Sequence, residues 1–188
     1  MAVLPIRIMG DPVLHAPASR VAEISDEIRT LVDDMFETMD AAPGVGLAAP
    51  QVGVGLRIFT YSYTDDDGAP WRGVILNPEL WMRPLEPGVP DDEEESEGCL
   101  SFPGERFPLR RSDEVLITGT DLDGQSVSIQ VDGWRARILQ HEFDHLDGIL
   151  YVDRLDDSDW KTAQKIAKKR AWGRPGKSWT PGIDDLDA

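Results

Sequence analysis

The stretch GWRARILQHEFDHLDG, residues 133–148, is the part of this chain from which its fold and its chemistry can both be worked out. Its apolar residues and its two histidines recur at helical spacing, which predicts a helix, and Gly148 can supply the left-handed residue that often ends one. His141 and His145 are four residues apart and therefore share one face of that helix. Glu142 points about 100° away around the axis, since an α-helix has about 3.6 residues per turn.

This H-E-x-x-H pattern leaves two interpretations open. Two imidazoles on one helix face can bind one metal ion, and Glu142 would then lie beside a metal-bound water, as in a hydrolytic site. The alternative is a structural pair of histidines on a buried helix. A catalytic metal also needs a third protein ligand, and no glutamate follows Glu142. The candidates for this ligand are Cys99, His15, Asp153, Asp156 and Asp157.

Two further segments carry the spacing of amphipathic helices, one towards each end of the chain. Residues 24–39 have apolar side chains at every third or fourth position, with Ser25 near the N-terminal cap. The segment AAPGVG then ends this helix, because proline and glycine both stop helices. Residues 158–172 also predict a helix, and we expect Ser158 to cap it.

The strand signals lie between the first and the last of these helices. Residues 56–63 and 72–78 predict strands on either side of a DDDGAP turn, and residues 114–131 predict a β-hairpin whose turn contains Asp123 and Gly124. Strands and helices do not alternate along the chain, so a doubly wound parallel sheet is not expected. The sequence therefore predicts an α+β fold with mixed or antiparallel β-sheets around a central metal-binding helix, flanked by an N-terminal and a C-terminal helix.

The chain has 188 residues, of which 40% are hydrophobic and 29% charged, and this is enough for one folded core. We expect a single catalytic domain over residues 1–172, with the metal-binding helix at about 133–147. Residues 173–188 are rich in proline, glycine and acidic residues, so they are expected to form a flexible, loosely held tail.

The charge and the cysteine content narrow the partners and the compartment. A net charge of −16 argues against nucleic-acid readout and against an anionic membrane surface, since both require a basic face. Cys99 is the one cysteine, which fits a reducing compartment. The N-terminal residues have neither a basic leader nor a long apolar run, so we expect no signal peptide, no membrane span and a cytoplasmic protein. Residues 91–97 are mostly acidic and should form a solvated loop, except at the end of the run, where Glu97 leads into the segment GCLS.

Three stretches resemble the signature motifs of the peptide deformylase family. They are GVGLAAPQ (44–51), EGCLS (97–101) and QHEFDHLDG (140–148). The three occur in the family's order and at sensible separations, and the resemblance runs from the first helix to about Leu155. Each motif alone is only suggestive, whereas the three together are highly specific.

The resemblance implies that Cys99, His141 and His145 bind one divalent metal ion. Fe²⁺ is the expected physiological ion, and Zn²⁺, Ni²⁺ or Co²⁺ can occupy the same ligands. The implied substrate is the N-formyl-methionine that begins a nascent polypeptide. Metal-activated water would attack the formyl group with Glu142 as general base, giving formate and a free N-terminal methionine.

The resemblance also assigns groups that bind the substrate. The side-chain amide of Gln51 and the backbone N–H of Leu100 would stabilise the negative charge that develops on the formyl oxygen. Gly44 and Gly46 have no β-carbon, so a substrate backbone could come close, and an extended peptide could pair with the main chain at Val45 and Gly46 as in strand addition. The alternative is a glycine-rich bend that leads into a strand.

The side chain of formyl-methionine needs an apolar pocket. Trp134 and Ile138 lie near the metal-binding face of the central helix, and with Val45 they are expected to line this pocket. The alkyl stem of Arg137 would lie at its rim. The alternative is that Trp134 and Ile138 simply belong to the core.

Charged residues around the motifs suggest two further contacts. Glu97 is expected to fix the loop of Cys99 by pairing with Arg106 or Arg111, and a surface ion pair is the alternative. The helix at 158–172 carries a basic stripe that could dock on the ribosome, where the substrate emerges, or simply face solvent. Its basic residues are Lys161, Lys165, Lys168, Lys169 and Arg170.

Two rival functions are also compatible with the residues. A zinc endopeptidase would combine H-E-x-x-H with an aspartate as third ligand, and its metal would survive the loss of Cys99. A metal-stabilised binding domain without activity would need neither Gln51 nor Glu142, so the presence of both favours an enzyme.

Overall fold

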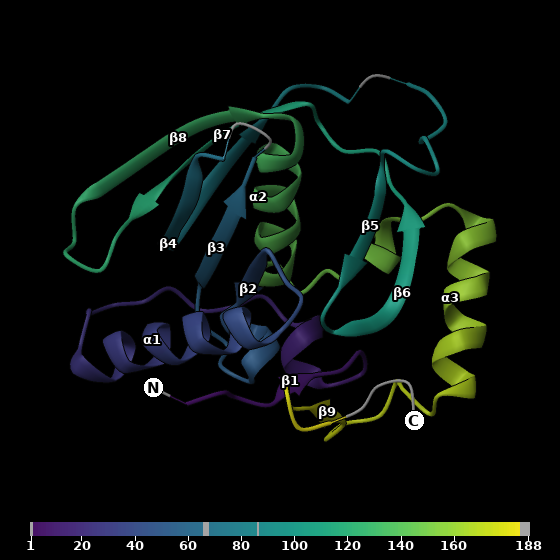
Figure 1. Ribbon diagram of the computed structural model, residues 1–188, viewed down its shortest axis with the longest axis horizontal. Helices are drawn as coiled ribbons and strands as arrows, with labels where there is room; N and C mark the ends of the chain where they lie inside the picture. Colours follow the sequence, from purple (N-terminus) through teal and green to yellow (C-terminus); the bar gives the residue numbers. More distant parts are fainter. Residues whose placement is uncertain (1, 66–67, 86, 185–188) are drawn as a thin grey trace.

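The computed structural model describes residues 2–65, 68–85 and 87–184 of the chain. Helix α2 (Gly133–Leu146) lies in the middle of the molecule (Figure 1). A five-stranded antiparallel sheet lies on one side of it, and a two-stranded hairpin and helix α3 (Asp157–Lys169) lie on the other. The prediction of an α+β fold with antiparallel sheets around a central helix is confirmed.

The larger sheet has the strand order β2-β3-β4-β7-β8, and each neighbouring pair is antiparallel. Its strands are β2 (Gly46–Ala48), β3 (Ile58–Thr64), β4 (Pro70–Met82), β7 (Glu114–Thr120) and β8 (Ser126–Asp132). The predicted strand pairs form, as β3–β4 and β7–β8. Gly124 has a φ of 73° in the tight turn between β7 and β8, a conformation that glycine adopts without strain.

Strand β4 continues beyond its predicted end at Pro78. Asn77 has a positive φ of 51°, and the pairing with β7 shifts register between Leu76 and Glu79, so the strand passes the proline through a bulge. The Asn77 amide accepts from the Val21 N–H at 2.8 Å and donates to the Val21 carbonyl at 2.9 Å. These two bonds hold the extended N-terminal segment against the sheet and support the unusual backbone of Asn77.

The remaining elements flank the larger sheet and α2. Helix α1 (Asp26–Ala41) contacts β2 and β3, and β5 (Ser96–Cys99) and β6 (Phe102–Pro108) form the separate hairpin. Strand β1 (Ile6–Arg7) pairs with β9 (Ser178–Trp179) near the other end of the chain. Three short 3₁₀ helices are η1 (Pro12–His15), η2 (Ala49–Val52) and η3 (Tyr151–Arg154). Among these described elements, no helix is both long enough and apolar enough to cross a membrane.

Helix α2 is fixed because one of its faces belongs to the core. Leu139 and Leu146 are fully buried and seven residues apart, so they share the face that packs with Phe59 and Ile117 of the sheet. Burial of such a side chain contributes about 1.5–3 kcal/mol. The residues on the opposite face of α2, among them both histidines, are therefore presented from a rigid base.

The cap of helix α3 differs from the prediction. The helix begins at Asp157, and its cap is Asp156 rather than Ser158. The Asp156 carboxylate accepts from the N–H groups of Ser158 and Asp159 at 2.8 and 2.9 Å. Serine and aspartate are comparable caps, so the pattern alone did not choose between them. The aspartate also places a negative charge at the positive end of the helix dipole.

Part of the expected tail is held in place. Ser178 and Trp179 pair with Arg7 and Ile6, and the Trp179 side chain is 6% exposed. The expectation of a loosely held segment therefore does not fit these two residues, because the composition of the tail did not reveal a partner strand near the start of the chain. Residues 185–188 lie outside the described part of the structure.

We expect Asp156→Ala to lower the free energy of unfolding by about 1 kcal/mol, because two N–H groups at the start of α3 lose their acceptor. Ser158→Ala is the matched control and should change stability by less than about 0.5 kcal/mol. Urea unfolding followed by circular dichroism measures both. A larger loss in the Ser158 variant would contradict the cap that the structure shows.

Candidate active site and metal centre

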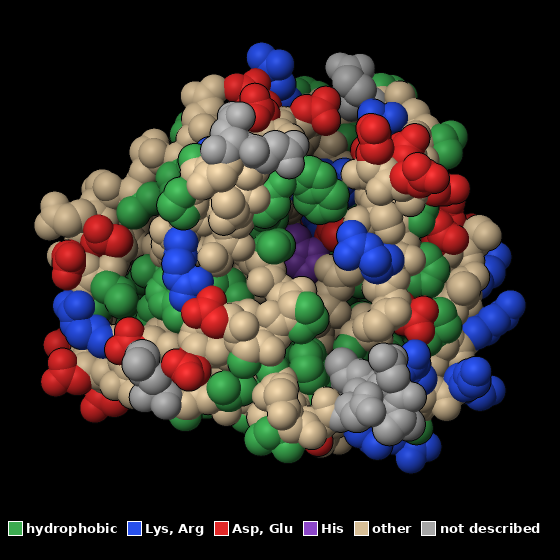
Figure 2. All heavy atoms as spheres, viewed as in Figure 1, with side chains coloured by type: hydrophobic (Ala, Val, Ile, Leu, Met, Phe, Trp, Pro, Cys, Tyr) green, Lys and Arg blue, Asp and Glu red, His purple; other side chains and the backbone are tan. Residues whose placement is uncertain are grey.

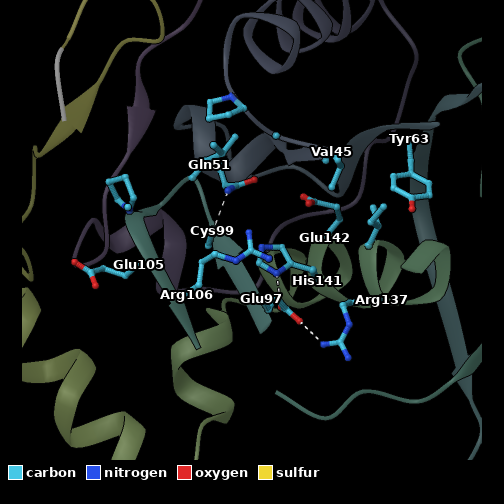
Figure 3. Close-up of a pocket in the computed structure, with 18 of the residues that line it drawn as sticks. Val45, Gln51, Tyr63, Glu97, Cys99, Glu105, Arg106, Arg137, His141 and Glu142 are labelled. Atoms are coloured by element: carbon cyan, nitrogen blue, oxygen red, sulfur yellow. Dashed lines mark hydrogen bonds and ion pairs between the residues drawn. The ribbon is translucent and has the colours of Figure 1, made fainter. Parts of the chain in front are cut away.

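A cavity of about 560 Å³ opens between β2, the β5–β6 hairpin and α2. Figure 2 shows a histidine at the bottom of the hollow in the middle of this face, and Figure 3 shows the side chains that point into it. Most of the residues singled out in the sequence line this cavity. They are Gly44, Val45, Gly46, Gln51, Glu97, Cys99, Leu100, Arg106, Trp134, Arg137, Ile138, His141 and Glu142.

Three donor atoms converge at the floor of the cavity. Cys99 Sγ lies 3.3 Å from His145 Nε2, which lies 3.2 Å from His141 Nε2, and one ligand atom of each residue lies within 4.8 Å of the other two. Ligands of a tetrahedral metal with bonds of about 2.0–2.3 Å stand roughly 3.3–3.6 Å apart. The donor set therefore fits a divalent cation that is bound by one thiolate and two imidazoles.

The ligands come from two elements that are distant in sequence. Cys99 ends strand β5, where the pairing with β6 shifts register after Gly98. His141 and His145 occupy successive turns of α2. The fully buried contacts of this helix with the sheet set the depth at which its two imidazoles meet the sulfur.

The buried carboxylate of Glu97 orients the His141 ring. Its Oε1 lies 2.5 Å from His141 Nδ1, and it accepts from Arg111 at 2.6 and 3.1 Å and from Arg137 at 3.2 Å (Figure 3). Burial raises the Glu97 pKa, but the charges of Arg111 and His141 outweigh burial and hold this pKa well below its usual value. When His141 is neutral, an ionised Glu97 accepts its Nδ1 proton, which leaves the Nε2 lone pair free to face a metal.

Of the two arginines expected near Glu97, the structure brings only Arg111 to it. Arg106 instead donates to the Ser96 carbonyl at 2.6 Å. The guanidinium of Arg137, whose stem was expected at the pocket rim, reaches below the cavity to Glu97 and donates to the Leu109 carbonyl at 2.6 Å. Sequence spacing could not choose between Arg106 and Arg111 as the partner of Glu97, because both lie shortly after it in the chain.

The charge network continues to residues that the sequence patterns did not single out. Arg111 donates to Asp144 at 2.5 Å, and Asp144 accepts two further bonds from Arg154 at 2.6 Å each. Asp144 lies between the two histidines on α2, but nothing in its local sequence indicated a partner on the hairpin side. The network connects the floor of the cavity with the surface beside η3.

Glu142 lies beside the converging donors and points into the cavity (Figure 3). Its Oε2 has no hydrogen-bond partner among the described residues, and burial raises its pKa to about 7. A carboxylate with a pKa near 7 can both accept a proton and return it, which suits a general base. A cation held nearby would lower this pKa, because opposite charge favours the ionised form.

Gly46 is required by the position of Glu142. A Cβ atom at Gly46 would lie 2.2 Å from Glu142 Oε1 and 2.6 Å from its Cδ. At Gly44, an added Cβ would meet Leu100 Cδ1 at 2.8 Å. The sequence-based reason for these glycines was close approach of a substrate backbone. The structure adds a different reason, which is that neighbouring side chains of the site occupy the space.

The amide of Gln51 has a fixed orientation. Its Oε1 accepts from the Ala48 N–H at 2.8 Å, so its NH₂ group faces the other way. That NH₂ group donates to Ser101 Oγ at 3.3 Å and lies 3.6 Å from Cys99 Sγ (Figure 3). The donor end of Gln51 therefore faces the proposed metal centre.

The residues expected to hold a methionine side chain surround one part of the cavity. Ile138 is 3% exposed, while Trp134 and Val45 are 41% and 43% exposed, so the buried face of the helix continues into an accessible rim. Tyr63 of β3 also lines the cavity, although no sequence motif pointed to it. It comes from the strand that pairs with β2, whereas the motifs draw attention only to β2 itself.

The other candidate third ligands are engaged elsewhere. Asp153 accepts from the Leu150 N–H at 2.9 Å, Asp156 caps α3, and Asp157 begins that helix. His15 accepts from the Gly10 N–H at 3.0 Å. Within the described residues, these side chains are not part of the cluster of potential metal ligands, so an endopeptidase with an aspartate ligand is not favoured.

A thiolate, two imidazoles and a buried carboxylate around an open cavity define the class of metal-dependent hydrolases. The family model described as "Polypeptide deformylase" matches residues 3–161. A peptide deformylase of Rhodococcus opacus is 50% identical over 186 residues, which cover 97% of this chain and 95% of that protein. One of Mycolicibacterium paratuberculosis is 50% identical over 189 residues, with 97% and 96% covered.

Solved structures agree with this assignment. A peptide deformylase from Legionella pneumophila superimposes with a TM-score of 0.76 at 35% identity, covering 90% of this chain and 96% of that one. One from Ehrlichia chaffeensis, in complex with actinonin, gives a TM-score of 0.76 at 36% identity, with 90% and 98% covered. The chain belongs to the polypeptide deformylase family. It is a metal-dependent hydrolase, and the reaction of its family is removal of the N-formyl group from nascent polypeptides.

We expect Arg111→Ala to lower the free energy of unfolding by about 3–5 kcal/mol, because it leaves the buried carboxylates of Glu97 and Asp144 short of a partner. Arg106→Ala, on strand β6 five residues earlier, should change it by less than about 0.5 kcal/mol. Denaturant titration of both variants provides the comparison. Similar losses in the two variants would contradict the pairing described above.

We expect Gly46→Ala to reduce formate release from a formyl-Met peptide at least about 100-fold, because the new methyl group displaces the Glu142 carboxylate. Gly55→Ala is the matched control, since its Cβ would meet nothing closer than Val13 Cγ2 at 3.8 Å. Metal content should stay unchanged in both. Near-normal turnover of the Gly46 variant would show that the Gly46 contact does not position the Glu142 carboxylate for turnover.

Proposed function

We propose that this chain removes the formyl group from N-terminal formyl-methionine with one divalent ion held by Cys99, His141 and His145. The convergence of these three donors beside the Glu142 carboxylate is the observation that carries the proposal. Family membership supports it, because removal of N-formyl groups is the reaction of the family. The products are formate and a free N-terminal methionine.

We propose Fe²⁺ as the physiological ion, following the family resemblance. A thiolate and two imidazoles are also suitable for Zn²⁺, Ni²⁺ and Co²⁺, so the donor set by itself accepts all four ions. A divalent ion in this position lowers the pKa of water and polarises the formyl carbonyl. Side chains and backbone groups of the chain carry out the proton transfers and stabilise the developing charge in the proposed reaction.

Glu142 is the proposed general base. Its carboxylate is buried beside the donors, and its Oε2 has no partner among the described residues, so it is available to a water molecule and to the substrate nitrogen. In the proposed reaction it takes a proton from the attacking water. It then gives this proton to the leaving amine as the C–N bond breaks.

The proposed oxyanion donors are the NH₂ group of Gln51 and the backbone N–H of Leu100. Gln51 is well suited because its oxygen is held by Ala48 and its nitrogen faces the donors. Leu100 lines the cavity directly after Cys99. Fixed donors around a developing negative charge typically contribute about 2.7–4 kcal/mol each to lowering the barrier.

The substrate peptide is proposed to lie along β2. This strand is the first in the sheet order, so its second edge has no neighbouring strand in the described structure, and Gly44, Val45 and Gly46 line the cavity at that edge. An extended peptide could add to this edge by main-chain hydrogen bonds. Val45, Trp134 and Ile138 would receive the methionine side chain, and the alkyl stem of Arg137 would lie at the rim of this pocket.

Docking on the ribosome and a cytoplasmic location stay predictions. Lys161, Lys165, Lys168 and Lys169 are exposed on α3, which is compatible with docking and equally with a solvated helix. Truncation at α3 is a poor test of docking, because it would also remove strand β9.

The central test is anaerobic purification with metal analysis, followed by formate release from formyl-Met-Ala. We expect Cys99→Ala to lose the bound metal, because a site with two imidazoles alone lacks its third ligand. We expect Glu142→Ala to keep the metal and to lose at least about 100-fold in turnover, because only the base is removed.

The two variants control each other, because one should change metal content and the other should change turnover alone. A Cys99→Ala protein that retains its metal would favour the endopeptidase with an aspartate ligand. A Glu142→Ala protein with normal turnover would remove this residue from the reaction.

A further inference from the structure

The C-terminal segment is bound to the first strand of the protein. The Ile8 N–H donates to the Lys177 carbonyl at 3.0 Å, and the Gly173 N–H donates to the Met9 carbonyl at 2.9 Å. A Cβ atom on Gly10 would lie 2.3 Å from the Gly173 backbone, so the two segments are in tight contact. Figure 1 shows β9 beside β1 below the β5–β6 hairpin.

The same N-terminal segment contacts the turn at Leu100 and Ser101, which directly follows Cys99 and is called the cysteine loop below. The Met9 N–H donates to the Ser101 carbonyl at 2.9 Å. From β9, the buried indole of Trp179 donates its Nε1–H to the Leu100 carbonyl at 2.8 Å and lines the active-site cavity. Consecutive carbonyls of the cysteine loop are thus held by the two ends of the chain.

The bond from Trp179 affects the sulfur through a single peptide group. The Leu100 carbonyl and the Ser101 N–H belong to the same planar unit, so fixing the oxygen also fixes the direction of the hydrogen. That Ser101 N–H donates to Cys99 Sγ at 3.4 Å. The indole therefore lies at one end of this peptide group and the proposed metal ligand at the other.

We propose that Trp179 is a positioning residue of the active site, which aims the Ser101 N–H at the Cys99 sulfur by holding the Leu100 carbonyl. The inference rests on the proposed function of Cys99 as a metal ligand. An N–H···S bond withdraws charge from a thiolate, and partners of this kind typically change metal affinity or activity by about 10–100-fold. Trp179 contacts neither the metal ligands nor the reacting atoms in this scheme.

If Trp179 only packed against its neighbours, a variant that keeps an aromatic ring but lacks the N–H donor should leave the site unchanged. If the hydrogen bond to Leu100 matters, the same variant should change the site. Trp179→Phe keeps an aromatic ring but removes the donor, whereas Trp179→His keeps a ring N–H. Trp81→Phe is the matched control, because Trp81 is half-exposed on β4, away from the cavity lining. A thermal unfolding scan accompanies each variant.

The test uses the full chain loaded with Co²⁺, whose absorption includes a sulfur-to-cobalt charge-transfer band. We expect Trp179→Phe to shift this band to longer wavelength, because the sulfur keeps more of its charge, and to lower kcat about 10-fold with little change in KM. Trp179→His should give a smaller shift and a smaller loss of kcat. Trp81→Phe should match the unchanged protein in both respects.

An unshifted band and an unchanged kcat in Trp179→Phe would overturn the inference while the proposed function stands. Loss of cooperative unfolding in both Trp179 variants would assign the residue to folding alone and would also overturn it. Absence of a sulfur-to-cobalt band in the unchanged protein would instead refute Cys99 as a ligand, so the two failures are distinguishable.

Discussion

The site depends on the contacts of the Glu97 carboxylate with His141 and Arg111. The contact with His141 joins the hairpin that carries Cys99 to the helix that carries both histidines. Glu97 is 4% exposed, and an unpaired carboxylate at this depth would cost several kcal/mol. Arg111 and Arg137 offset this cost from two directions. Because the same carboxylate also orients the His141 ring, a change at Glu97 alters both the contact between hairpin and helix and the geometry of the proposed metal centre.

Close packing at the cavity wall imposes a second constraint. Glu142 occupies the space in front of Gly46, and Gln51 is held by the backbone of Ala48, so both proposed reacting side chains are fixed by the strand and turn that follow α1. Groups held in place before the substrate arrives lose little conformational freedom during the reaction. The short strand β2 and its glycines therefore serve the chemistry of the site as much as the architecture of the sheet.

Much of the fold could be predicted because it is encoded by local spacing. Helix α2, the strand pairs β3–β4 and β7–β8 and the helices near the two ends all follow from periods of about 3.6 or 2 residues and from turn residues such as Gly124. His141 and His145 share a face for the same reason. The third donor is different, since spacing left Cys99, His15 and three aspartates open, and only the resemblance of the motifs pointed to Cys99.

The sequence by itself determined the elements, the pair of histidines with its neighbouring glutamate and, through three motifs, the family. The tertiary structure decided which distant groups meet: Arg111 rather than Arg106 at Glu97, Asp144 behind them, and Trp179 at the Leu100 carbonyl. It also decided that Asp156 rather than Ser158 caps α3. The physical reason is that periodicity records how a segment faces the core, whereas a choice between similar partners depends on packing between residues far apart in the chain.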